Sequence, residues 1–218
     1  MKSKKYVYLG ISGAAIAAVI IIITQFHIFP SEDQNNPQSS QVAFLDFSYD
    51  EENSDLKSTL ATYHINMTKP ITLSTQTDVR QYCNFLTDPT KQALVTYCTS
   101  TDLKDNQGFL GDISMLGSPD VPGIVVVALQ SNPVLSNYND VKTVFGVALN
   151  STICPCWEKE SPGGFTSLNS LLDKLLSTHK TTAEPTTSTP TLPLGNKHFK
   201  IELTTNENGY LWKLLVAK

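Results

Sequence analysis

Residues 199–216 read FKIELTTNENGYLWKLLV and carry the clearest structural signal of the chain, that of a β-hairpin. Apolar Phe199, Ile201 and Leu203 alternate with polar Lys200, Glu202 and Thr204. The segments 199–204 and 210–216 are separated by Asn208-Gly209, the preferred pair for a two-residue type I′ turn. A turn centred there pairs Leu203 with Leu214, so that the two apolar faces coincide, whereas a slip of one residue would place them on opposite sides. The sequence therefore predicts a hairpin with one buried face.

Upstream of the hairpin, the pattern predicts further strands and helices. Strands are expected at 42–49, 71–73, 124–129 and 141–149, and helices at 77–86, 88–98 and 168–176, with a weaker indication at 56–63. Thr77 or Asp78 is the expected N-cap of the first clear helix, and Asp88 that of the second. Glycines and prolines within 106–123 predict a long loop, and the Thr/Pro tract 181–193 predicts an extended loop that does not pack. The fold class is α+β, with about five mostly antiparallel strands and three helices.

The N-terminal region predicts a membrane anchor. Residues 6–23 contain no charge, and the apolar character continues to residue 29, which gives enough length to cross a bilayer. Three lysines precede the run within the basic tail 1–5, and acids follow it, so the positive-inside rule leaves the N-terminus in the cytoplasm. The segment 6–29 is thus expected to be an uncleaved signal-anchor helix in the cell membrane. The polar stretch 30–41 is expected to be a stalk and 42–218 an exported domain, with residues 31–218 outside; a cleaved signal peptide is the alternative.

The chain has four cysteines, all in the region predicted to be exported, where thiols generally form disulfides. Cys83 and Cys98 are expected on the apolar faces of consecutive helices, which makes them the favoured pair. Cys154 and Cys156 enclose a single proline, and a bond between them would be strained and easily reduced. Pairing with other cysteines, thiol redox chemistry and binding of a soft metal such as Cu(I) are alternatives for these two residues.

Other candidate chemistry is sparse. The four histidines (His27, His64, His179 and His198) show no metal-ligand spacing, and His179 is expected at a helix C-terminus, where a cationic ring needs no further function. Neither a nucleophile elbow nor a phosphate loop is present, and no pattern indicates a cofactor, although a triad of distant residues stays open. Asn66 and Asn150 begin sequons for N-linked sugars.

The charge composition bears on the class of partner. Arg80 is the only arginine, and acids outnumber bases by 20 to 16, which argues against a nucleic-acid partner. The sequence favours a membrane-anchored extracytoplasmic protein with a small binding or structural domain over an enzyme. Its partners are expected to be the lipid bilayer, through residues 6–29, and a surface protein or glycan. The alternative is an anchored thiol-redox or soft-metal-handling protein that uses Cys154 and Cys156.

Overall fold

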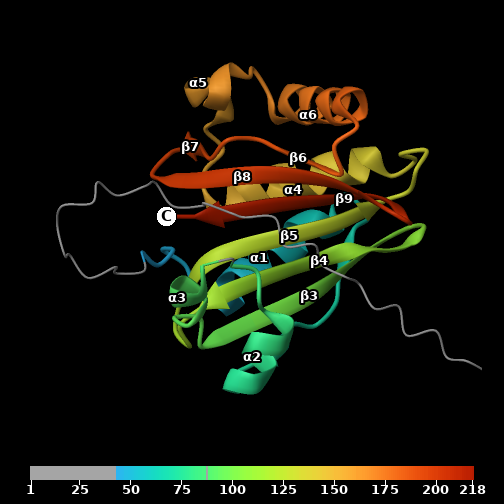
Figure 1. Cartoon of the computed structure of the whole chain (residues 1–218). Coiled ribbons are helices and arrows are strands. Elements are labelled where there is room, and N and C mark those ends of the chain that lie inside the picture. Colours follow the sequence, from blue (N-terminus) through green and yellow to red (C-terminus); the bar gives the residue numbers. More distant parts are fainter. Residues whose placement is uncertain (1–42, 87) are drawn as a thin grey trace, which may run out of the picture.

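The predicted hairpin forms part of a sheet in the computed structural model, which describes residues 43–86 and 88–218. It consists of β8 (Lys197–Asn206) and β9 (Gly209–Ala217) (Figure 1). The other strands are β1 (Asn66–Met67), β2 (Ile71–Leu73), β3 (Tyr97–Asp105), β4 (Gly108–Gly117), β5 (Pro122–Ser131), β6 (Thr186–Ser188) and β7 (Leu192–Leu194). The helices are α1 (Tyr49–Ala61), α2 (Gln76–Tyr82), α3 (Pro89–Gln92), α4 (Tyr138–Thr152), α5 (Trp157–Glu160) and α6 (Leu168–Thr182), with a 3-10 turn at Pro162–Gly164.

All strand pairs in this sheet are antiparallel, in the order β1-β3-β4-β5-β9-β8-β6, with β2 on β3 and β7 on β8. The α+β class with antiparallel strands is therefore confirmed. The expected numbers of about five strands and three helices are too low, because the described residues hold nine strands and six α-helices. The additional strands are mostly short or rich in glycine, so their sequence patterns are weak.

The hairpin register differs from the predicted one by two residues. Leu203 pairs with Trp212 rather than with Leu214, and the two-residue turn is Glu207-Asn208. Neither turn residue has a positive φ, so the turn is not type I′. Gly209 begins β9 instead, where a Cβ atom would collide with the backbone of the residues that end β5. A shift of two residues leaves the same side chains on each face, so the predicted inward face is confirmed.

The sheet has a buried layer on each face. Over one face, α1, α4 and α6 cover the larger core, to which Trp212, Leu214 and Val216 belong; Figure 1 shows α1 and α4 behind the sheet. On the opposite face a smaller buried cluster joins α2 to the end of the sheet where β5 begins, and it contains Val79 and Leu215. Lys213, next to Trp212, lies on this second face and is partly exposed.

Two predicted elements at the start of the domain need correction. Residues 43–48 form no strand, although Leu45 donates one backbone hydrogen bond to Pro122. Ser48 caps α1 by accepting a hydrogen bond from the backbone N–H of Glu51, which begins the helix where a strand was expected to end. The weakly indicated helix at 56–63 is confirmed as the second half of α1, and β2 forms as predicted.

The predicted long loop at 106–123 is wrong, because β4 spans Gly108–Gly117. At Gly111 the backbone lies so close to Ala128 and Leu129 of β5 that no Cβ would fit, and Gly117 is similarly close to the residues that open β5. Glycine here permits close strand contact. Composition alone cannot distinguish that use of glycine from a turn.

The predicted strand at 141–149 is wrong as well, because the segment lies within α4. Val141, Val144, Phe145 and Ala148 are all buried and follow the spacing of one helical face. The strand prediction placed Val141, Phe145, Val147 and Leu149 on one face, an alternating pattern that leaves out the buried Val144 and Ala148. Asn137 occupies the N-cap position of the helix.

The helices that lead to the first pair of cysteines also differ from prediction. α2 is capped by Thr75, two residues before the expected position, and α3 is capped by Asp88 as predicted. α3 ends at Gln92, however, so Cys98 lies on β3 and not on a second helix. α6 is confirmed, and its N-terminus carries a capping box made by Ser167 and Ser170.

The Thr/Pro tract 181–193 packs against the sheet, contrary to prediction. Residues 186–188 and 192–194 pair with β8 as β6 and β7, and Thr189 is buried between them. The backbone of Ile201 donates a hydrogen bond to the Thr189 hydroxyl at 3.0 Å. Threonine has a high propensity for strands, so a tract of this composition can cover a sheet edge.

Candidate functional site

The domain has two distinct ends, defined by the direction of its strands. At one end, which we call the entry end, the backbone N–H of Leu45 donates a hydrogen bond to the carbonyl of Pro122, shortly before the chain enters α1. At the far end lie the connections 105–108, 131–138, 183–185 and 206–209. The far end is therefore the end of the sheet opposite Leu45.

A hollow of 460 Å³ lies at this far end, between the last turn of α6 and the β8–β9 hairpin. It is lined by His179, Lys180, Ala183, Glu184, Pro185, Thr205 and Tyr210. Glu184 and Lys180 supply one charge of each sign, and Tyr210 supplies an aromatic ring. The hollow is open to solvent, and most of the residues that line it are polar or charged.

His179 forms the floor of the hollow. Its side chain is 3% exposed, and its two ring nitrogens lie 2.9 Å from the Thr187 hydroxyl and 2.7 Å from the Thr205 hydroxyl. Burial lowers the pKa of His179, so the neutral ring is favoured. His179 lies in the last turn of α6, as predicted, but its burial favours a neutral ring over the expected cationic one. The spacing of four residues from Leu175 places His179 on the apolar stripe of α6, a signal that could have indicated its burial.

Tyr210 stands beside this histidine on the first part of β9. The His179 and Tyr210 rings pack edge to face with their centres 6.0 Å apart, and the Lys180 amine lies 5.9 Å from the centre of the Tyr210 ring. Ala183 at the end of α6 adopts a left-handed conformation, which turns the chain toward β6. Helix, turn and hairpin thus hold the lining residues in one place.

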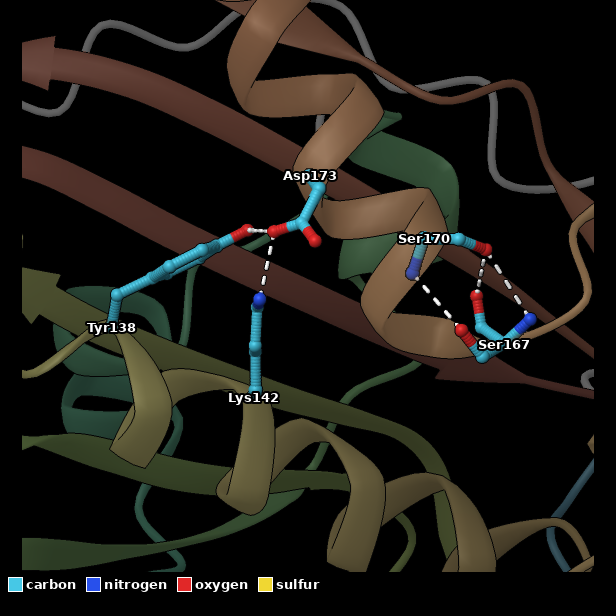
Figure 2. A network of polar contacts seen from close by, with 5 residues as sticks. All are labelled: Tyr138, Lys142, Ser167, Ser170 and Asp173. Carbon is cyan, nitrogen blue, oxygen red and sulfur yellow. Dashed lines mark hydrogen bonds and ion pairs between the residues drawn. The ribbon is translucent and has the colours of Figure 1, made fainter.

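A second polar group joins α4 to α6 (Figure 2). The Tyr138 hydroxyl donates to Asp173 at 3.0 Å, and the Lys142 amine lies 2.7 Å from the same carboxylate oxygen. The ion pair with Lys142 lowers the pKa of Asp173, while burial and Asp173 raise the pKa of Tyr138. Because the Asp173 side chain is 57% exposed, we interpret the group as a contact that positions α6.

Two carboxylates lie opposite each other on β3 and β4, at Asp102 and Asp112. Burial raises the pKa of Asp112 to about 6, even though the Ser114 hydroxyl donates a hydrogen bond to it at 3.3 Å. Sequence reasoning missed this pair because the region was interpreted as a loop. Within residues 43–86 and 88–218, no group of three or more His, Cys, Asp or Glu side chains is placed to hold a metal ion.

Both cysteine pairs form disulfides. Cys83, at the end of α2, is bonded to Cys98 on β3, with Cα atoms 6.5 Å apart. This confirms the favoured pair, although the bond joins a helix to a strand. Cys154 and Cys156 are bonded to each other, with Cα atoms 5.2 Å apart, in the connection between α4 and α5.

The two sequon asparagines are exposed, but neither is in a loop. Asn66 lies on β1 and Asn150 in the last turn of α4. Their threonines make local contacts: Thr68 accepts a hydrogen bond from the backbone of Asp102, and Thr152 donates one to Ala148 within its helix. Attachment of sugars to either asparagine remains a prediction.

Comparison with known proteins gives no assignment, since no family model, curated protein or solved structure matches this chain. The predicted anchor 6–29 and stalk 30–41 lie outside the described residues. Within the part that is described, no helix combines the length and apolar character needed to cross a membrane.

Proposed function

We propose that this chain is a single-pass membrane protein whose domain binds a ligand outside the cytoplasm. The uncharged run 6–23 behind three lysines supports an anchor with a cytoplasmic N-terminus. The two disulfides support an oxidising location for the domain, because such bonds are rare in reducing compartments. The site residues and the attachment point then belong to opposite ends of the domain.

The observation that carries the proposal is the hollow around His179 and Tyr210 at the far end. We assign it to one sugar unit of a surface glycan. The C–H face of a sugar ring packs well against an aromatic ring such as Tyr210, while its hydroxyl groups suit mixed donors and acceptors. Thr205, Glu184 and Lys180 provide these groups at the rim.

Binding of full-length protein in detergent to a panel of immobilised glycans tests the site. Tyr210→Ala is expected to weaken binding at least about tenfold, the equivalent of about 1.4 kcal/mol. Tyr63→Ala is the matched control, because Tyr63 is 55% exposed and lies outside the hollow. Equal binding by both variants, or no binding by the native chain, would overturn the assignment.

The location is tested separately. Protease added to intact cells is expected to remove residues 31–218 while a reporter fused to the N-terminus survives. The reverse pattern of protection would show that the orientation is wrong, whatever the outcome of the glycan experiment.

A further inference from the structure

The two disulfides differ in how deeply they are buried. Cys83 and Cys98 are 1% and 0% exposed and belong to the smaller core cluster. Cys154 and Cys156 are partly exposed at the edge of the larger core, and Pro155 between them is exposed. Part of each residue of the second pair therefore reaches solvent, whereas the first pair is enclosed.

The two bonds also differ in what they contribute to folding. The Cys83–Cys98 bond closes a sequence separation of 15 residues, and the Cys154–Cys156 bond a separation of 2. A short loop restricts the unfolded chain only slightly, so a bond that closes it adds little stability. Stability therefore explains the presence of the first bond much better than that of the second.

Other contacts already hold the segment that contains Cys154 and Cys156. The buried Lys197 amine donates to the carbonyl of Thr152 at 2.7 Å, and the backbone of Gly195 donates to Glu160 at 2.6 Å. Next to Cys156, the Trp157 ring packs against Phe199 with ring centres 5.6 Å apart. These contacts fix both sides of the Cys-Pro-Cys turn without the disulfide.

We propose that Cys154 and Cys156 form an exchangeable disulfide that oxidises dithiols of other proteins outside the cytoplasm. This activity is independent of the glycan site, because the two sites share no residue. One thiolate of the substrate attacks a sulfur of the bond, forming a mixed disulfide and releasing the other protein cysteine as a thiolate. The second substrate thiolate then attacks the substrate sulfur of the mixed disulfide. The substrate leaves with one disulfide, its two thiol protons pass to the cysteine thiolates, and Cys154 and Cys156 are left as thiols.

A single-turnover experiment tests the exchange with the full-length oxidised chain in detergent. The probe is a synthetic peptide that carries two cysteines, and mass spectrometry follows both its oxidation and the alkylation of the protein. We expect one peptide disulfide per protein chain, with alkylation confined to Cys154 and Cys156. Alkylation of all four cysteines at equal rates, or an unoxidised peptide, would overturn the proposal.

Turnover provides a second arm, with oxidised glutathione as the co-reactant that restores the bond. The native chain is expected to accelerate peptide oxidation at least about tenfold over glutathione alone. The paired change Cys154→Ser and Cys156→Ser should remove the acceleration. The single-turnover experiment uses only the native protein, so its result does not depend on whether this variant folds. Acceleration that persists in the variant would contradict the assignment of the site.

Discussion

The indole Nε1 of Trp212 donates a hydrogen bond of 2.9 Å to the hydroxyl of Ser131, 81 residues earlier in the chain. This contact links the last residue of β5 to the fully buried ring at the centre of the larger core. Tyr138 of α4 stacks on the same ring at 5.2 Å. The polar atom of the largest side chain in the core is therefore satisfied, and both sheet and helix pack against its apolar surface.

Trp212→Ala is expected to lower the free energy of unfolding by about 3–5 kcal/mol, because it removes a large buried ring and leaves a cavity. Lys213→Ala, on the partly exposed opposite face, is expected to change it by less than about 0.5 kcal/mol. Urea denaturation of the two variants checks the difference. Small and equal losses would contradict the observed packing of β9.

Two glycines of β4 offer a test of why a glycine-rich segment forms a strand. Gly108 and Gly111 both have positive φ, but only at Gly111 would a Cβ collide with the neighbouring backbone of β5. Gly108→Ala should cost about 1–2 kcal/mol from backbone conformation alone. Gly111→Ala should cost clearly more, since the strands must separate. Equal thermal shifts in the two variants would show that close contact is not what Gly111 provides.

The sequence predicted those elements in which one pattern dominates. Alternation in residues 199–204 and the Asn-Gly pair at 208–209 indicated the hairpin, and the leucine stripe that leads to His179 indicated α6. β4 was missed because Gly111 is required by the strand beside it, a partner that composition does not reveal. α4 was missed because its β-branched valines favour a strand locally, while packing against the sheet selects a helix.

The candidate site was less predictable than the fold. Its lining comes from α6, the turn that follows it and the hairpin, which are brought together only by the folded sheet. Cys83 and Cys98 were paired correctly, although the prediction placed Cys98 on a helix and the structure places it on β3. No sequence pattern brings Tyr210 and His179 together, because 31 positions and the three strands β6, β7 and β8 separate them.

The raised pKa of Asp112 predicts that the stability of the fold depends on pH. Its folded value of about 6 lies above the ordinary value of 3.8, so the folded state retains a proton that the unfolded state has lost. The contribution of Asp112 to the free energy of unfolding therefore falls as the pH rises from about 4 to about 6. Above that range its full destabilising effect is present. Asp112→Asn is expected to stabilise the chain by up to about 3 kcal/mol at pH 7.5 and not at pH 3.5. Urea unfolding midpoints of the native chain and the variant at both pH values check this prediction. An equal gain in stability at both pH values would show that the pKa of Asp112 is not raised.

For His179 we expect stability to change with pH in the opposite direction. Burial places its folded pKa below the ordinary value of 6.5, so the unfolded state binds a proton first as the pH falls. The stability contributed by the neutral ring is present above pH 6.5 and is lost as the pH falls through the folded pKa. His179→Gln should remove this part of the pH dependence while leaving that of Asp112 in place. Identical pH profiles of the native chain and the variant, with stability measured between pH 7.5 and 5, would contradict it.

The two disulfides predict different effects on stability. The paired change Cys83→Ala and Cys98→Ala should lower the free energy of unfolding by about 3 kcal/mol, because a bond across 15 positions restricts the unfolded chain strongly. The paired change Cys154→Ser and Cys156→Ser should cost about 1 kcal/mol, since the bond spans only 2 positions. Lys197 and Glu160 should continue to hold the turn through their bonds to Thr152 and Gly195. Denaturation of the two double variants under non-reducing conditions measures both losses. A loss at the second bond as large as that at the first would assign Cys154 and Cys156 a structural role and remove the stability argument for their exchange chemistry.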